Sequence, residues 1–186
     1  MKKLILGIVL SLIIILFFSI NVQVEDKINE INNLISEWNP QAENSKLIAK
    51  TIYFESKIYD VNRRSILAIA IQESDFNKDA IGSSGEIGIM QIKPNTAKDM
   101  LEKDESLEIH KIKDNIILGI RYFKFCRYNL YKYADNNNEL LLLTFAAYNQ
   151  GLWGVKSKLE KGNSPINEYA EEAFKLREAI LNGNLN

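Results

Sequence analysis

The feature that most restricts the fold is a short segment in the middle of the chain in which every residue is apolar. Ile66 to Ile71 combines isoleucine and leucine with alanine. Because alanines are present and β-branched residues do not dominate, helix is favoured over a buried parallel strand. A helix that is apolar on every face must be surrounded by other elements. The sequence therefore predicts a central helix from Arg63 to about Ser74, capped by Asn62.

The chain after about residue 44 continues in helical rather than strand patterns. The glycine-rich stretch from Ala80 to Gln91 predicts a loop, and Pro94 favours the start of a short helix. Further helices are expected at about 114–133, 139–150 and 167–181. Another helix should begin near Ser45, with an apolar stripe of Leu47, Ile48, Thr51, Ile52, Glu55 and Ile58. With no repeats and no strand pairs of any strength, the predicted fold class is mainly α.

The N-terminus carries an export signal. Lys2 and Lys3 precede a nearly unbroken apolar run, Leu4 to Ile20, at the short edge of the roughly 17 to 25 residues that cross a bilayer. The residues after it lack the small-x-small pattern that a signal peptidase prefers, and no cysteine is there for lipid attachment. An uncleaved membrane anchor is therefore favoured over a poorly marked cleavable signal. In either case the rest of the chain is exported, to the periplasm or the outer face of the cytoplasmic membrane.

Three regions follow from these patterns. Residues 1–22 form the signal-anchor or signal peptide. Residues 23–43 form an amphipathic helix or linker, in which apolar residues recur at helical spacing between Ile28 and Trp38 before Pro40 ends the segment. This helix has three open roles: packing on the domain, lying on the membrane, or serving as a stalk. Residues 44–186 form a single exported domain.

Composition excludes several classes of function. The 186 residues carry a net charge of -1, which gives no electrostatic grip on nucleic acid. His110, the single histidine, has no histidine or cysteine partner for a metal site and is expected at the surface. Cys126 is the single cysteine, so it forms no intramolecular disulfide and is expected as a small buried side chain. We predict no metal and no nucleic-acid partner.

Glu73 stands out because it follows the apolar run. On a helix it shares a stripe with Ile66, Ile69 and Ala70. Burial there disfavours the charged carboxylate and raises its pKa, as a proton donor near neutral pH requires. Taken alone, a helix-end glutamate that points into solvent is the better explanation, so other segments must decide.

Three further segments follow the Glu73 segment at fixed order and spacing. Gln72-Glu73-Ser74 precedes Gly85 to Gln91, then Asn115 to Tyr122, then Ala146 to Gly151. Each is weak alone, but four in this order make a chance match improbable. Together, over residues 60 to 160, they resemble the lytic transglycosylases of the soluble, goose-lysozyme-like superfamily, with the transglycosylase SLT domain. The resemblance implies that 44–186 is one lysozyme-like, mainly α catalytic domain.

The resemblance also implies roles for single residues. Glu73 matches the family's one catalytic glutamate. Ser74 matches a serine that supports the local backbone, and it has no base partner that would make it a nucleophile. Gly85 and Gly88 match glycines that let the loop pass close to the sugar chain.

Other matched residues are expected around the glutamate. Met90 and Gln91 match the pair that lines the cleft, where the glutamine hydrogen-bonds the substrate. Tyr148 and Asn149 match an aromatic-amide pair, and the tyrosine hydroxyl is expected to bond Glu73. Three residues on one helix face match the scaffold: Asn115, Gly119 and Tyr122.

The chain departs from the family pattern at three positions. Many relatives have a serine that bonds the catalytic glutamate where this chain has Gly82, and Ser83 or Ser84 are the candidates to replace it. Glu86 stands where a small residue is usual, and Lys93 where a methionine is frequent. Both charged side chains are expected to face solvent.

The implied reaction is cleavage of peptidoglycan glycan strands between N-acetylmuramic acid and N-acetylglucosamine, with 1,6-anhydro ends and no cofactor. Two alternatives remain. A lysozyme-like hydrolase on the same fold needs a second carboxylate, for which Glu86, Asp75 and Asp79 are candidates. A non-catalytic scaffold would bind the wall without turnover. The expected partners are thus glycan strands, and the membrane through Leu4 to Ile20.

Overall fold

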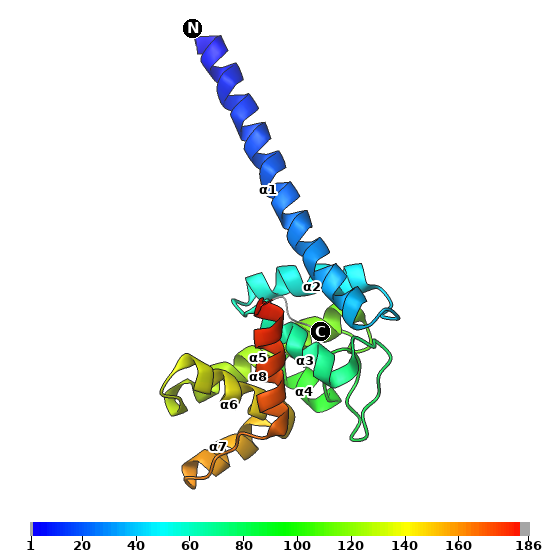
Figure 1. The fold of residues 1–186 in the computed structure, drawn as a ribbon, viewed down its shortest axis with the longest axis vertical. Helices are drawn as coiled ribbons and strands as arrows, with labels where there is room; N and C mark the ends of the chain where they lie inside the picture. Colours follow the sequence, from blue (N-terminus) through cyan, green and yellow to red (C-terminus); the bar gives the residue numbers. More distant parts are fainter. Residues whose placement is uncertain (1, 183–186) are drawn as a thin grey trace.

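A computed structural model describes residues 2–182, and its regular secondary structure is helical, as the sequence predicted. The described residues also contain two isolated antiparallel β-bridges, at Ile81–Ile87 and Ile87–Ile92. The helices of Figure 1 are α1 (Lys2–Trp38), α2 (Ser45–Ile58), α3 (Arg63–Ser74), α4 (Pro94–Asp99), α5 (Ile112–Leu130), the 3-10 turn η1 (Tyr131–Tyr133), α6 (Asn137–Gln150), α7 (Leu152–Glu160) and α8 (Glu168–Asn182).

Helix α3 is the centre of the domain. Every residue from Ser65 to Ile71 is buried, and Asn62 caps the helix by accepting a hydrogen bond from the backbone N–H of Arg64 at 2.9 Å. Helices α2 and α8 pack against α3, and α8 also packs against α6. The prediction of a central helix with an Asn62 cap is therefore confirmed. Because α3 is enclosed, its last turn is fixed in position, which matters for the site described below.

Helix α1 joins the apolar N-terminal run to the domain without a break. Its side chains from Val9 to Val22 are exposed, whereas Ile28, Ile31 and Ile35 are buried in the core beside α2. Figure 1 shows the first part of α1 projecting as a rod from the other helices. The sequence left three roles open for the helix in residues 23–43. In the structure this helix packs on the domain. The segment from Val9 is long and apolar enough to cross a membrane.

Two local details differ from the predicted pattern. In α2, Leu47 and Ile58 are 45% and 68% exposed, because the buried face of the helix is centred on Ile48 and Ile52. Helix α7 was not predicted. Gly151, at a φ of 87°, ends α6 and starts α7 within one residue, which its lack of a side chain permits.

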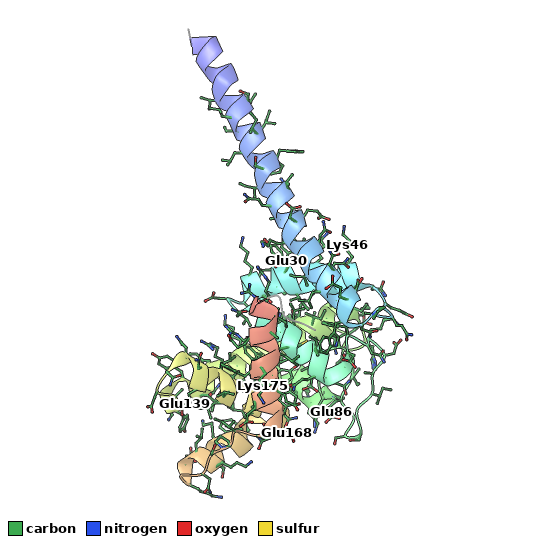
Figure 2. All side chains as sticks on the ribbon, in the orientation of Figure 1. Glu30, Lys46, Glu86, Glu139, Glu168 and Lys175 are labelled. Carbon is green, nitrogen blue, oxygen red and sulfur yellow. The ribbon has the colours of Figure 1, made fainter. Side chains whose placement is uncertain are left out.

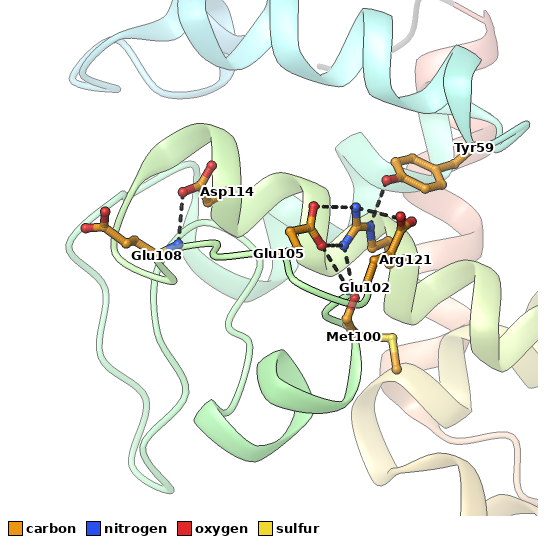
Figure 3. Close-up of polar contacts among 7 residues, drawn as sticks. All are labelled: Tyr59, Met100, Glu102, Glu105, Glu108, Asp114 and Arg121. Atoms are coloured by element: carbon orange, nitrogen blue, oxygen red, sulfur yellow. Dashed lines mark hydrogen bonds and ion pairs between the residues drawn. The ribbon is translucent and has the colours of Figure 1, made fainter.

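The segment between α4 and α5 is held by one arginine. Arg121 of α5 donates hydrogen bonds to the hydroxyl of Tyr59, the carbonyl of Met100 and the carboxylate of Glu105 (Figure 3). The pKa of Glu105 falls to about 2, chiefly through the hydrogen bond from Arg121. This cluster ties residues 100–105 to α5. Farther along the chain, His110 is exposed and Cys126 is buried, as expected.

Candidate active site

Glu73 lies in the last turn of α3, directly after the buried segment. The helix ends because Asp75 and Phe76 adopt positive φ angles of 52° and 63°. The Oε1 atom of Glu73 accepts a 2.6 Å hydrogen bond from the hydroxyl of Tyr169 on α8. The carboxyl group is thus held by one neutral donor at the end of a rigid helix, rather than pointing freely into solvent.

The surroundings of Glu73 shift its proton affinity strongly. Burial raises the pKa of Glu73 to about 7, and the negative charge of Glu86 adds to the rise. The hydrogen bond from Tyr169 acts in the opposite direction, because it favours the ionised form. A carboxyl with a pKa near 7 is present in both protonation states at neutral pH. It can therefore give a proton and later take one back.

A cleft of about 390 Å³ opens above Glu73. One wall is the loop after α3 together with the start of α4, and the other is α5 and the end of α6. The lining residues are Glu73, Gly82, Ser83, Glu86, Gln91, Ile92, Lys93, Thr96, Tyr122, Tyr148, Asn149, Gln150 and Gly151. The structure therefore brings five of the seven predicted site residues to one cleft: Glu73, Ser83, Gln91, Tyr148 and Asn149.

The other two predicted residues lie behind the cleft wall. Ser74 donates its hydroxyl to the carbonyl of Ile89 at 2.9 Å, so it joins α3 to the loop. Met90 is fully buried and does not line the cleft as expected. Its side chain fills the space that Gly119 leaves open, since a Cβ atom on Gly119 would lie 2.7 Å from Met90. Both residues thus support the loop from beneath.

Asn115 fixes the same loop through its side-chain amide. Its Oδ1 accepts from the backbone N–H of Met90, and its Nδ2 donates to the carbonyls of Ile87 and Ile109. Gly88 lies against this amide at a φ of +76°, where a Cβ atom would come within 2.7 Å of Asn115 Nδ2. Position 88 therefore requires glycine on grounds of space and backbone conformation.

The tyrosine that bonds Glu73 is a different residue from the one expected. Tyr148 donates its hydroxyl to the carbonyl of Met90 at 2.8 Å, and its predicted bond to Glu73 is made by Tyr169 instead. Burial, with a contribution from the charge of Glu73, keeps the pKa of Tyr148 well above its usual value. Tyr169 comes from the first turn of α8, 96 residues after Glu73, and no motif in the sequence marked it.

Polar side chains at the cleft have defined partners. Gln91, at a φ of 43°, donates from Nε2 to the carbonyls of Ala80 and Gly88. Asn149 is exposed, and its Oδ1 accepts from Asn167 at 3.0 Å. Ser83 is exposed at the cleft edge. Gln91 and Ser83 both line the cleft.

The three departures from the family pattern meet in this cleft. Glu86 forms a 3.2 Å ion pair with Lys93 and accepts from the backbone N–H of Ser84. A Cβ atom on Gly82 would lie 2.4 Å from the Glu86 carboxylate and 2.7 Å from the oxygen of Gln91. Glu86 therefore occupies the space of a side chain at position 82. Its side chain is only 22% exposed, so the expectation that it faces solvent is wrong; Figure 2 labels it.

The chain is similar to known proteins over most of its length. A family model described as the transglycosylase SLT domain matches residues 50–169. The membrane-bound lytic murein transglycosylase E of Buchnera aphidicola subsp. Baizongia pistaciae is 28% identical over an alignment of 158 residues, and the match covers 81% of this chain and 74% of that protein.

Two solved structures share the fold. An inactive mutant of the lytic transglycosylase Slt from Pseudomonas aeruginosa superposes on 82% of this chain with a TM-score of 0.56 and 22% identity. The 70 kDa soluble lytic transglycosylase from Escherichia coli superposes on 83%, with a TM-score of 0.50 and 22% identity. In both cases the match spans 28% of the larger protein, about a quarter of its length. The family match takes in most of this chain, including Glu73 and the whole cleft, and the chain belongs to the transglycosylase SLT domain family.

Proposed function

We propose that the protein is a peptidoglycan lytic transglycosylase. It cleaves the β-1,4 bond between N-acetylmuramic acid and N-acetylglucosamine and leaves 1,6-anhydromuramic acid ends. The observation that carries this proposal is the Glu73 carboxyl, which lies at the cleft in a largely buried position with a pKa near 7. The name of the relative from Buchnera aphidicola, a lytic murein transglycosylase, supports it.

In the first step Glu73 acts as the acid. Its protonated carboxyl gives the proton to the oxygen of the scissile bond, and that bond to the anomeric carbon of the muramic residue breaks. The N-acetyl group of the substrate stabilises the positive charge that develops at this carbon. Burial keeps enough of Glu73 protonated near pH 7 for this step.

In the second step Glu73, now a carboxylate, acts as the base. It takes the proton of the muramic C6 hydroxyl, whose oxygen forms a bond to the anomeric carbon and closes the anhydro ring. Glu73 thereby regains its starting form, and no water is consumed. An intramolecular hydroxyl competes well with water because its effective concentration is very high, on the order of 10⁵ M or more in well-oriented cases.

The Glu73→Gln variant tests the proposal. Glutamine fills the same space and keeps a partner for Tyr169 but cannot donate a proton, so release of soluble fragments from purified sacculi should fall by about a thousandfold or more. Glu171→Gln is the matched control, because Glu171 is exposed on α8. Full activity in Glu73→Gln would remove Glu73 from the mechanism. Binding without cleavage by the wild type would favour the scaffold alternative.

Hydrolysis is the second candidate, and the position of Glu86 favours it. Of the three residues that the sequence offered as the second carboxylate, Glu86 lines the same cleft as Glu73. Asp75 instead accepts from Trp38, and Asp79 pairs with Lys78. Backbone hydrogen bonds, together with the ion pair to Lys93, lower the pKa of Glu86 and keep its carboxylate ionised, but the ion pair also occupies one of its oxygens. Transglycosylation remains the proposal because Glu73 alone suffices for it.

The apolar part of α1 supports a position of the enzyme at a membrane. We propose that it stays uncleaved, with Lys2 and Lys3 in the cytoplasm and the cleft on the outer side, where peptidoglycan lies. The word membrane-bound in the name of the relative supports this placement. Full-length protein should remain in the membrane fraction after an alkaline carbonate wash. A shorter, soluble product with a new N-terminus would contradict it.

A further inference from the structure

The outer face of α2, the side turned away from the core, carries a regular pattern of side chains that neither the packing nor the cleft explains. At about 100° per residue, the exposed side chains of this helix fall on one side, opposite Ile48 and Ile52. Three are lysines, which form one stripe along the helix, and three are apolar, which form a second stripe beside it. The outer face consists of Lys46, Leu47, Lys50, Phe54, Lys57 and Ile58.

The apolar stripe of this face is unfavourable in water. Leu47, Phe54 and Ile58 are 45%, 38% and 68% exposed, and their spacing places them in one line along the helix. Apolar side chains that gather on an exposed face mark a surface that contacts a protein or a membrane. Lysine is depleted in protein–protein interfaces but is typical of helices that lie among lipid headgroups. The lysine stripe therefore favours a membrane as the partner.

Helix α1 brings the outer face of α2 close to the end of its own apolar segment. Lys46 forms a 2.7 Å ion pair with Glu25, which comes five residues after Ile20. At 1.5 Å per residue, that is about 8 Å along the helix axis. The pKa of Glu25 is lowered by its hydrogen bond from Lys46 and by the charge of Lys50, so both lysines lie near this part of α1.

The figures agree with this placement. Figure 1 shows α2 lying across α1 on the side of the domain from which the rod projects, and Figure 2 labels Lys46 beside α1. If the apolar part of α1 crosses a bilayer, α2 is thus the helix of the domain that lies nearest to the bilayer surface.

Positive charge continues past the end of α2. Lys57 lines a hollow of about 460 Å³ together with Arg63 and Arg64 from the first turn of α3, against one carboxylate, Asp60. The guanidinium of Arg63 lies over the ring of Tyr53, 5.7 Å from its centre. The N-terminus of α3 adds partial positive charge. A phosphate group next to this end of α2 would therefore meet favourable charge.

We infer that the outer face of α2 lies on the surface of the membrane that α1 enters and binds its anionic phospholipid headgroups. The inference rests on the proposed membrane placement of α1. The lysines contact headgroup phosphates, and Leu47, Phe54 and Ile58 enter the boundary between headgroups and acyl chains. A spanning helix alone leaves the domain free to turn about the helix axis, whereas a second contact through α2 fixes its orientation. Helix α7, at the opposite end of the domain in Figure 1, then points away from the membrane.

A fluorophore at position 54 tests this contact in the full-length protein. Phe54→Cys, labelled with the NBD fluorophore and reconstituted into vesicles of phosphatidylcholine and phosphatidylglycerol, should be quenched by lipids that carry a spin label near the headgroup. Trp153→Cys is the matched control, because Trp153 is 69% exposed on α7 and its label should not be quenched. Cys126 does not compete for the label, because it is fully buried and burial raises its pKa to about 12. No quenching at position 54, or equal quenching at both positions, would overturn the inference.

Charge variants test the role of the headgroups. Lys50→Gln combined with Lys57→Gln should lower the docking equilibrium constant, obtained from the quenched fraction at position 54, about twentyfold, since each lysine near an anionic surface contributes roughly a fivefold preference. Lys132→Gln combined with Lys161→Gln, two exposed lysines in η1 and at the end of α7, should leave the constant unchanged. High salt, or vesicles of phosphatidylcholine alone, should also weaken quenching. Quenching that responds to neither charge nor salt would overturn the binding of anionic headgroups.

Failure of this inference can be told apart from failure of the proposed function. The carbonate wash reports on the anchor, and cleavage of sacculi reports on the Glu73 cleft. Labelled protein that stays in the membrane and cleaves glycan strands, but shows no quenching at position 54, would overturn the α2 contact alone. Loss of the wild type from the membrane fraction would overturn the anchor and this inference with it.

Discussion

At the scale of single residues, two neighbours pull the proton affinity of Glu73 in opposite directions. The hydroxyl of Tyr169 favours the ionised carboxylate, and the charge of Glu86 favours the protonated form. Burial is the larger influence and sets the pKa near 7. The balance matters because the proposed mechanism requires Glu73 to be protonated at the start and ionised halfway.

Two variants should move the pH dependence in opposite directions. Tyr169→Phe removes the bond that lowers the pKa of Glu73, so the loss of activity at alkaline pH should begin at a higher pH. Glu86→Gln removes a charge that raises this pKa, so the loss should begin at a lower pH. The measurement is kcat/KM against pH, with Glu171→Gln as the control that leaves the profile in place. Shifts of the same sign in both variants would contradict this description of the site.

A residue of the site could be predicted from the sequence only where it belongs to a recognisable local pattern. Glu73 and Gln91 belong to short segments whose order and spacing were informative, and both line the cleft. Tyr169 sits in an ordinary amphipathic helix, and only the packing of α8 on α3 brings its hydroxyl to Glu73. Glu86 was misjudged because its burial depends on the space above Gly82, which no sequence pattern reports.

At the scale of elements, the catalytic loop is positioned by α5 through a glycine. Gly119 lies against Met90. The backbone carbonyl of Met90 in turn accepts a hydrogen bond from the hydroxyl of Tyr148. A side chain at position 119 would push on a buried methionine in a closely packed interior. The helix surface and the loop that carries Gln91 are therefore coupled.

Gly119→Ala should destabilise the protein by about 1–3 kcal/mol and lower activity, because Met90 and the loop must move. Gly154→Ala is the matched control: it is also a helical glycine, in α7, and its Cβ atom would meet nothing within 4 Å. That change should stabilise by about 0.5–1 kcal/mol, the usual gain for alanine over glycine in a helix. Urea unfolding of both variants measures the difference. An equal effect of the two substitutions would count against the packing role of Gly119.

The elements themselves were largely predictable, and their exceptions have physical causes. Asn62 and Pro94 are residue types that favour the start of a helix, and helices α3 and α4 begin where these two residues predicted. Helix α7 was missed because a glycine normally ends a helix, and the immediate restart after Gly151 depends on tertiary packing of Leu152 and Val155 in the core.

At the scale of the whole molecule, α1 links the apolar N-terminal segment to the catalytic domain as one helix. The sequence suggested a boundary at residue 22, but Ile28, Ile31 and Ile35 are core residues. The end of the same helix reaches Asp75 through Trp38. The catalytic domain is thus held to α1 by buried contacts with α2 and by the exposed hydrogen bond from Trp38 to Asp75, directly after α3.

Ile31→Ala should lower the free energy of unfolding by about 2–5 kcal/mol, as expected for a fully packed isoleucine. Ile15→Ala, at a position 61% exposed in the same helix, should leave domain stability unchanged in detergent. Thermal or urea unfolding of the detergent-solubilised proteins measures both. An unaffected Ile31→Ala variant would mean that the domain does not depend on α1.

The central claim, that Glu73 acts as acid and then as base without consuming water, is tested most directly by the ends of the first products. Purified sacculi digested by the full-length protein and analysed by mass spectrometry should yield fragments with 1,6-anhydromuramic ends. Each fragment should be lighter than the hydrolysed product by the mass of one water, about 18 Da. The Glu73→Gln protein should yield none. Reducing muramic ends among the primary products would contradict the account and point to hydrolysis, with Glu86 as the second carboxylate.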